Sequence, residues 1–180
     1  MKGSIYVELS KCLSCHSCEL ACALEHSESK ELAKAIYEDP APVARVRLEQ
    51  VEGTAIPLQC RHCEDAPCVI ICPSGAIEKL GPEQAVIIHE DKCIGCKFCI
   101  AVCPFGVVDL RSDGKVALKC DLCLSRTEEG LQPACVNACP SGALRFLSAE
   151  ELSKQKRQVA ARREYEAAQS GKEQAKEEQT

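Results

Sequence analysis

Large aromatic side chains are scarce in this sequence. Among its 180 residues there is no tryptophan, and there are only three phenylalanines, three tyrosines and one methionine. Because aromatic residues normally supply a large share of the apolar area in a protein core, this composition argues against a conventional core. We expect something other than large apolar side chains to fill the centre of the fold.

Long apolar segments are absent as well. The longest apolar runs, such as residues 69–72 and 100–103, are only a few residues long, whereas a transmembrane helix needs about 20. The first segment, MKGSIYVELSKCLSC, has no apolar signal region, no small-residue cleavage site and no twin-arginine pair. We therefore expect no membrane span, no export signal and a cytoplasmic location.

An excess of positive charge is also missing. The formal net charge is −5 at pH 7, whereas nucleic-acid-binding proteins are usually basic. A cofactor held by thiolates would make the protein more acidic still. The charge therefore predicts no nucleic-acid partner.

Cysteine, in contrast, is abundant, with sixteen residues in four separate groups. Because disulfides are rare in a reducing cytoplasm, so many cysteines indicate metal binding. In chain order the groups are Cys12, Cys15, Cys18 and Cys22; Cys60, Cys63, Cys68 and Cys72; Cys93, Cys96, Cys99 and Cys103; and Cys120, Cys123, Cys135 and Cys139.

The spacing within the groups separates the possible metals. Each group opens with CxxC and ends with a cysteine four residues after its third one. The third group, CIGCKFCIAVCP, has the C-x2-C-x2-C-x3-C-P spacing of bacterial ferredoxins, in which one run shares its cysteines between two iron–sulfur clusters. Zinc sites rarely need a third cysteine at this spacing. The spacing therefore predicts iron–sulfur clusters, with a structural zinc protein as the alternative.

The other three groups depart from this spacing without losing a cysteine. The second group has two extra residues before its third cysteine, the fourth group has eleven residues there, and the first group has Ala23 where the others have proline. Extra residues lengthen a surface loop, and proline binds no metal. We therefore expect all sixteen cysteines to be metal ligands in four 4Fe-4S clusters.

The number of cysteines also favours electron transfer over catalysis. A catalytic cluster usually leaves one iron open, which would appear as a group of three cysteines, and no such group is present. The sequence thus predicts a protein that is not an enzyme by itself. We expect the four histidines to be packed or solvent-facing rings, and Lys97 and Lys119 to be ordinary surface lysines, with an effect on cluster potential as the alternative.

Secondary structure is expected to be short and mixed. Apolar or alternating runs predict strands at residues 5–9, 43–51, 85–89 and 116–119, often in hairpins, and each interval from the third to the fourth cysteine of a group is expected to form about one helical turn. The stretch AKAIYEDPAPVAR, inside the long cysteine-free interval 23–59, is expected to be a surface loop, with a partner-binding element as the alternative. The fold class is therefore α+β.

The last part of the chain has a different character. Ser148 and Glu151 form the pattern of a capping box, and the residues that follow to about 168 are good helix formers with a thin apolar stripe. From residue 170 the sequence is typical of a solvated, frayed tail. We expect a polyferredoxin domain at 1–147 and a polar C-terminal helix with its tail at 148–180, either lying on the surface or docking another subunit.

Residues 3–147 resemble a known family. The motifs CLSCHSC, CRHCEDAPCVIICPSGAI, CIGCKFCIAVCPFG and KCDLC…ACVNACPSGAL resemble the four-cluster iron–sulfur subunits of the dimethyl-sulfoxide-reductase and formate-dehydrogenase family. Close relatives of these subunits serve hydrogenases, carbon monoxide dehydrogenases and tungsten aldehyde oxidoreductases. The segment CELACALEHS looks most like the small relatives that accompany the last two.

The resemblance implies an architecture and a set of ligands. It implies two bacterial-ferredoxin-like modules of two clusters each, related by a pseudo-two-fold axis, in which the first group exchanges its last cysteine with the fourth group and the second with the third. The implied sets are Cys12, Cys15, Cys18 and Cys139 (the Cys18 set); Cys120, Cys123, Cys135 and Cys22 (the Cys135 set); Cys60, Cys63, Cys68 and Cys103 (the Cys68 set); and Cys93, Cys96, Cys99 and Cys72 (the Cys99 set).

The resemblance also implies a function and partners. It implies an electron-transfer subunit that conducts between a catalytic oxidoreductase subunit and another redox partner. A tungsten or molybdenum enzyme, such as aldehyde oxidoreductase or formate dehydrogenase, is the expected partner. Carbon monoxide dehydrogenase, hydrogenase or no fixed partner are the alternatives. Membrane-bound relatives carry a C-terminal anchor, and the polar helix in its place suggests self-association into larger assemblies.

Overall fold

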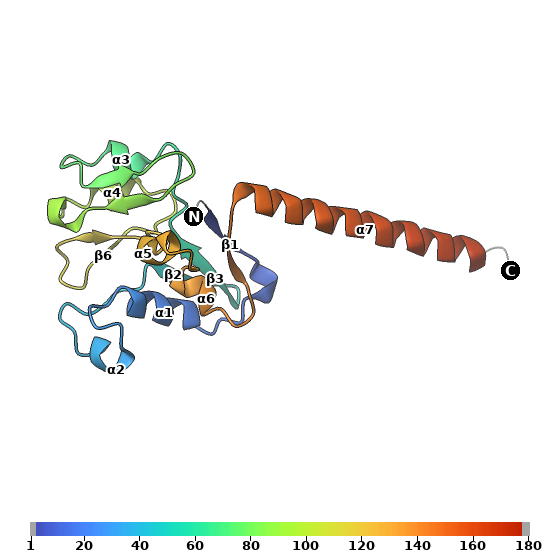
Figure 1. The fold of residues 1–180 in the computed structure, drawn as a ribbon, viewed down its shortest axis with the longest axis horizontal. Helices are drawn as coiled ribbons and strands as arrows, with labels where there is room; N and C mark the ends of the chain where they lie inside the picture. Colours follow the sequence, from blue (N-terminus) through green and yellow to red (C-terminus); the bar gives the residue numbers. More distant parts are fainter. Residues whose placement is uncertain (1–2, 178–180) are drawn as a thin grey trace. The chain divides into compact units, whose positions relative to one another are not determined.

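The computed structural model describes residues 3–177, and the side chains of that range up to residue 169. The chain divides into two compact units, the first ending at Phe146 and the second beginning at Leu147. Figure 1 shows the first unit as a set of short strands and helices and the second as one long helix, α7.

The described part of the first unit contains four two-stranded sheets. Three of them, β2–β3, β4–β5 and β6–β7, are antiparallel hairpins of strands that follow one another in the chain, whereas the fourth joins the first strand to the last. The pairs are β1 (Ser4–Val7) with β8 (Leu144–Leu147), β2 (Val46–Val51) with β3 (Thr54–Gln59), β4 (Ile77–Lys79) with β5 (Val86–Ile88), and β6 (Asp109–Leu110) with β7 (Ala117–Leu118).

Short helices alternate with these strands, which confirms the α+β class. Each of the four predicted strand segments overlaps an observed strand, β1, β2, β5 or β7. The helical elements of the first unit are η1 (Leu9–Lys11), α1 (Ser17–Glu25), α2 (Leu32–Ala35), α3 (Pro67–Ile70), η2 (Glu90–Lys92), α4 (Phe98–Val102), α5 (Leu124–Glu128) and α6 (Ala134–Asn137).

Four of these helices carry the third cysteine of a group, as the spacing predicted. They are α1, α3, α4 and α6. In the last three groups the chain turns sharply after the helix, because proline follows the last cysteine and the N–H of Gly75, Gly106 or Gly142 then donates to that cysteine's carbonyl. These glycines have φ between 61° and 65°, a conformation that glycine adopts without strain. With Ala23 in place of proline, α1 instead continues to Glu25.

The helices pack in two pairs, α1 against α6 and α3 against α4, and Figure 1 shows the two pairs in different parts of the first unit. A separate buried cluster accompanies each pair. The first core contains Cys18, Cys22, Cys120 and Cys135 together with Ile5, Val46, Leu144 and Phe146, and the second core contains Cys99 with Val86, Val108, Ile77 and alanines. Both cores thus consist mainly of aliphatic side chains and cysteines, and Phe146 is the one aromatic residue in these buried clusters of the described residues, in keeping with the shortage of aromatics.

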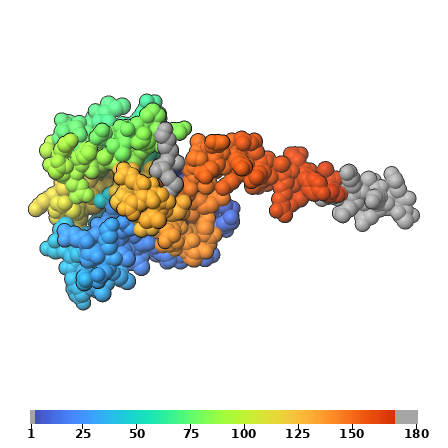
Figure 2. Space-filling view, viewed as in Figure 1, coloured from blue at the N-terminus to red at the C-terminus, as the bar shows by residue number. Residues whose placement is uncertain are grey.

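The segment between α1 and β2 forms the surface excursion that its prolines suggested. It contains the single turn of α2 and a cis peptide bond between Asp39 and Pro40. Ile36 and Tyr37 are largely exposed. In the space-filling view this segment lies, in blue, at the lower edge of the first unit (Figure 2).

The second unit consists of α7 (Ala149–Glu177). The capping box at its start is confirmed, because the Ser148 hydroxyl accepts from the Glu151 N–H at 3.2 Å and the Glu151 carboxylate accepts from the Ser148 N–H at 2.8 Å. The helix continues to Glu177, past the expected end near residue 168, since the segment AKEE consists of good helix formers. The last part of the expected tail, residues 178–180, lies outside the described residues.

None of the helices in the described part of the chain has the length and apolar character needed to cross a membrane.

Candidate metal centres

All sixteen cysteines lie among the described residues, and each of them is a free thiol. A disulfide scaffold, the other common reason for so many cysteines, is therefore not how this fold is held together. The free thiols lie in four places, and at each place a cysteine from one group meets cysteines from another.

The most buried thiols are those of the Cys135 set. Cys135 interacts electrostatically with Cys22 and Cys123, and Cys120 with Cys135 and Cys22. Burial is the largest cause of a raised pKa at Cys120, Cys123 and Cys135, and neighbouring thiols contribute to the rise, which brings the pKa of Cys123 to about 12. Cys22 reaches this place from α1, in the first group, because α1 packs against α6.

The Cys18 set also involves α1 and the fourth group. Cys15 and Cys18, from the first group, both interact electrostatically with Cys139, the last cysteine of the fourth group. Burial raises the pKa of Cys18 to about 11, whereas Cys15 is exposed and a hydrogen bond with Ser17 lowers its pKa. Cys12 lies in the same loop as Cys15.

The remaining two sets are built around α3 and α4. Cys68 interacts with Cys60 of its own group and with Cys103 of the third group. A small cavity is lined by Cys93, Cys96 and Cys99 together with Cys72 of the second group. Cys63 packs against the second core, which contains Cys99. In both sets the crossing cysteine is thus the last one of the partner group.

The loops that carry the first two cysteines share one backbone feature. The residue two positions after the first cysteine has a positive φ in every group, at Ser14, His62, Gly95 and Leu122. A left-handed residue in such a turn directs successive N–H groups toward one point and forms an anion-binding concavity of the kind found at iron–sulfur sites. Two of these N–H groups, those of His62 and Leu122, lie 3.4 and 3.5 Å from the sulfur of the preceding cysteine.

Among the four loop residues with a positive φ, Gly95 has the least space for a side chain. Its φ is 67°, and a Cβ there would lie 2.5 Å from the backbone carbonyl oxygen of Lys115. We expect Gly95→Ala to destabilise the fold by about 2–4 kcal/mol and to weaken metal binding by the Cys99 set. Thermal unfolding together with the iron content of the variant measures both effects.

Gly114→Ala is the matched control for that substitution. Gly114 has a similar φ of 71°, but nothing lies within 4 Å of a Cβ built on it. Only the left-handed backbone of a non-glycine residue would be penalised, which costs about 1–2 kcal/mol. Equal losses in the two variants would show that the close approach of Gly95 to Lys115 has no role.

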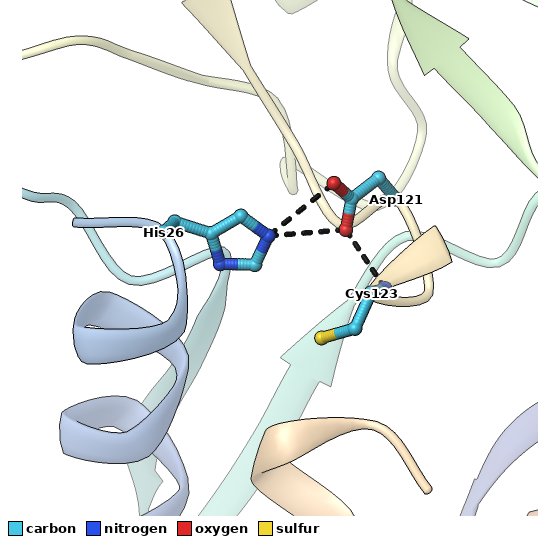
Figure 3. Close-up of side chains that lie close together, drawn as sticks. All are labelled: His26, Asp121 and Cys123. Carbon is cyan, nitrogen blue, oxygen red and sulfur yellow. Dashed lines mark hydrogen bonds and ion pairs between the residues drawn. The ribbon is translucent and has the colours of Figure 1, made fainter. Parts of the chain in front are cut away.

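A charged network fixes Cys22 relative to the fourth group. His26, at the end of α1, donates from Nε2 to the Asp121 carboxylate at 3.1 Å and from Nδ1 to the Cys22 carbonyl at 2.8 Å. Arg45 donates to Asp121 at 2.8 Å, and its backbone N–H lies 3.2 Å from the Cys22 sulfur. Figure 3 shows the Asp121 carboxylate between the His26 ring and the Cys123 N–H, which donates to it at 2.9 Å.

The electrostatics of this network show what His26 and Asp121 do. Burial lowers the pKa of His26, but its hydrogen bonds to Asp121 and Cys22 outweigh burial and raise the pKa to about 10. The same contact holds the pKa of Asp121 well below its usual range, although burial opposes this. His26, Asp121 and Cys123 could together hold a metal ion by distance, yet His26 and Asp121 already form an ion pair. We therefore interpret them as the residues that join α1 to the Cys120–Cys123 loop.

One residue beside the cysteines, Lys119, lies where the sequence alone did not place it, whereas His62 is a packed ring as expected. Lys119 is 3% exposed, so the expectation of a surface lysine is wrong for this residue, while Lys97 is exposed as expected. His62 is buried, and its Nδ1 accepts from the Val86 N–H at 2.9 Å. His16, His26 and His89 are paired with acidic side chains. The sequence analysis did not identify Asp121 or Arg45 as residues of these centres. The position of Asp121 between two cysteines was the one available signal for this network.

The donor set fits iron–sulfur clusters. Thiols that are buried together and raise one another's pKa hold their protons more firmly than free cysteine, so they become thiolates when a cationic metal centre replaces the protons. The left-handed loop residues add N–H groups that stabilise the resulting negative charge. The fold and these centres define the class of the protein, which is a multi-cluster protein of the ferredoxin type.

Comparisons with known proteins agree with this class. Residues 51–149 match the model of the 4Fe-4S dicluster domain, and residues 9–25 match that of a 4Fe-4S binding domain. An iron-sulfur protein of Rhodospirillum rubrum is 45% identical over 155 residues, which cover 79% of this chain and 80% of the relative. The electron transport protein HydN of Escherichia coli (strain K12) is 37% identical over 177 residues, covering 87% and 96%.

A further relative carries the name of an enzyme subunit. The probable anaerobic dimethyl sulfoxide reductase chain YnfG of Escherichia coli (strain K12) is 38% identical over 152 residues, which cover 82% of this chain and 74% of the relative. The chain belongs to the 4Fe-4S dicluster family. It is a multi-cluster, ferredoxin-like electron-transfer protein.

Proposed function

We propose that this chain conducts electrons along four 4Fe-4S clusters, held by the Cys18, Cys135, Cys68 and Cys99 sets, between a catalytic oxidoreductase subunit and a second redox partner. Bound clusters would supply one-electron chemistry, with potentials that depend on hydrogen bonds, charge and exposure. The chain itself holds the ligands, buries the Cys135 set and presents the exposed cysteines to partners. It has no catalytic role of its own in this proposal.

One observation carries the proposal more than any other. In each of the four places where thiols meet, the last cysteine of one group lies with cysteines of another group. A zinc site formed by one group would need no such exchange, whereas the ferredoxin arrangement depends on it. The exchange also pairs the first group with the fourth and the second with the third, which supports two modules and their pseudo-two-fold relation.

The exposure of the cysteines suggests where electrons enter and leave. Cys15 and Cys96 are exposed, whereas Cys120, Cys123 and Cys135 are buried. An exposed apolar side chain lies two residues before each of these cysteines, Leu13 at the first and Ile94 at the second, each more than 60% exposed. We infer that the Cys18 and Cys99 sets are the two ends of the conducting chain and that the other two sets connect them.

The catalytic partner in this proposal is a tungsten or molybdenum enzyme, such as aldehyde oxidoreductase or formate dehydrogenase. The relative named as a dimethyl sulfoxide reductase chain supports an oxidoreductase partner, and the tungsten or molybdenum type is inferred from the resemblance of the cysteine motifs. The first alternative partner is a nickel enzyme, either carbon monoxide dehydrogenase or hydrogenase. The second alternative is a free polyferredoxin with no fixed partner.

Elemental analysis of the native complex tests this choice. The complex would be captured anaerobically from its own cells through this chain, with an unrelated ferredoxin captured in parallel as the control. We expect iron together with tungsten or molybdenum in the captured complex. Iron with nickel would replace the proposed partner by the alternative, and iron alone would leave a free polyferredoxin.

We propose further that α7 links copies of this subunit into larger assemblies. Val159 and Tyr165 are 52% and 65% exposed, and a helix of this length gains most of its stability from packing. Deleting residues 148–180 is therefore expected to reduce the assembly to its smallest unit, as measured by light scattering after size-exclusion chromatography. Replacing both Val159 and Tyr165 by glutamate should have the same effect, and an unchanged assembly size in both variants would contradict the proposal.

A further inference from the structure

Lys119 is a buried lysine that forms no ion pair with an acidic side chain of the described residues. It directly precedes Cys120, follows β7 and is 3% exposed. Its Nζ donates to the carbonyl of Cys120 at 3.0 Å and, in a shorter contact, to the carbonyl of Val86. Among the ion pairs of residues 3–177 there is none that involves Lys119.

These contacts place the ammonium group where the two cores of the first unit meet. Cys120 belongs to the first core and Val86 to the second. The N–H of the same Val86 donates to Nδ1 of His62, which lies between Cys60 and Cys63. One hydrogen-bonded path therefore runs from the loop of the Cys68 set, through Val86 and Lys119, to the loop of the Cys135 set.

Lys119 also lies near a thiol of the second core. Burial raises the pKa of Cys68, and the charge of Lys119 is the largest effect that opposes this rise. The ammonium group is thus within electrostatic reach of the Cys68 set while its hydrogen bond is to Cys120 of the Cys135 set. No other lysine of the described residues is as deeply buried.

The energetics of such a group require a counter-ion. An ammonium group taken out of water loses its hydration, and this loss is large unless an opposite charge lies nearby. Two carbonyls satisfy two of its three donors, but they carry no net charge. The anions available at this place are the metal centres themselves, because clusters with four thiolate ligands are negatively charged.

We propose that Lys119 is the shared counter-ion of the two iron–sulfur sites on either side of it, those of the Cys68 set and the Cys135 set. This inference rests on the ligand sets of the proposed function. An electron that arrives at either site adds one negative charge there, and it leaves for the next site with no bond formed or broken. The fixed positive charge of Lys119 favours that added charge, so it raises the reduction potentials of both sites together.

The consequence concerns the transfer of an electron between the two modules. Lys119 lies on the hydrogen-bonded path that joins the loop of the Cys68 set to the loop of the Cys135 set. Because the same charge acts on both sites, it raises their potentials in parallel and leaves the difference between them unchanged. Lys119 then sets the reduction potentials of the two sites between which the electron passes. The Cys18 and Cys99 sets are outside its influence.

The test is a comparison of Lys119 variants by redox titration followed with electron paramagnetic resonance. Lys119→Gln removes the charge but keeps a hydrogen-bond donor, Lys119→Met removes both, and Lys119→Arg keeps the charge. Lys97→Met is the matched control, because Lys97 lies between Cys96 and Cys99 but is exposed to solvent, where its charge is screened. Cys68→Ser and Cys135→Ser identify which signals belong to the two inner sets.

We expect both neutral variants to lower the potentials of the two inner sites and to leave those of the two outer sites unchanged. Lys119→Arg should keep all four potentials near their original values, and Lys97→Met should shift none of them. A neutral variant that binds only the two outer clusters would also support the counter-ion role, since it is the inner sites that lose their balancing charge. Iron lost equally from all four sets would contradict it.

Other outcomes separate this inference from the proposed function. Four clusters with unchanged potentials in Lys119→Gln, or potentials that fall in Lys119→Met but not in Lys119→Gln, would show that Lys119 acts through its hydrogen bonds and would overturn the inference alone. A wild-type protein without four clusters would instead overturn the proposed function.

Discussion

Removal of iron is expected to unfold the first unit of the protein. Its two cores consist mainly of aliphatic side chains and cysteines, and Phe146 is the only aromatic residue in the buried clusters of the described residues. The buried thiols of the metal-free chain would have to pack against one another with little apolar surface. Where no binding site is preformed in the unfolded chain, the free energy of metal binding becomes free energy of folding.

The expected effect is as large as the stability of the domain. Small domains are stable by about 5–15 kcal/mol in total, so we expect the iron-free chain to show no cooperative thermal transition. Circular dichroism before and after anaerobic chelation measures this, and refolding after iron and sulfide are returned is the control. A metal-free chain that keeps its thermal transition would show that these cores suffice without metal.

The substitution Cys96→Ser is expected to remove one cluster and to destabilise the second core. Cys96 is exposed, and most substitutions at exposed positions change stability by less than about 0.5 kcal/mol. If Cys96 were an ordinary surface thiol, serine would be a mild replacement. If Cys96 is instead a ligand in the Cys99 set, its replacement removes the metal centre that it would share with Cys72, Cys93 and Cys99.

Iron content and thermal unfolding measure this second prediction. We expect Cys96→Ser to bind three quarters of the iron of the wild type and to unfold at a clearly lower temperature. Ile94→Ser is the matched control, since Ile94 is an exposed neighbour in the same loop and carries no ligand atom. A Cys96→Ser protein with one cluster less but an unchanged unfolding temperature would show that this cluster does not support the fold.

Much of the local structure could be predicted from the sequence because it depends on short-range patterns. The helical turns at the third cysteine of each group, the strand segments β1, β2, β5 and β7, and the capping box at Ser148 all follow from neighbouring residues. The strand β3 was missed because Pro57 lies within it, and proline normally argues against a strand. The extent of α7 was underestimated because helix formers continue beyond the polar SGK segment.

The centres themselves were predictable in a different way. The spacing of cysteines indicates iron–sulfur clusters, and the exchange of cysteines between groups came from the resemblance to a family. The burial of Lys119 could not be predicted, because it depends on the contact of Lys119 with Val86, which lies 33 residues earlier in the sequence. The network of His26, Arg45 and Asp121 was missed for the same reason, since it joins three separate segments around Cys22.

The most direct test of the account is the content of iron and acid-labile sulfide in the full chain, purified without oxygen. Four 4Fe-4S clusters predict about sixteen iron atoms and about sixteen sulfides per chain, in a brown protein. A colourless protein that contains zinc and no sulfide would contradict the account, and so would an iron content of about half this value, since it would leave two of the four cysteine sets without a cluster.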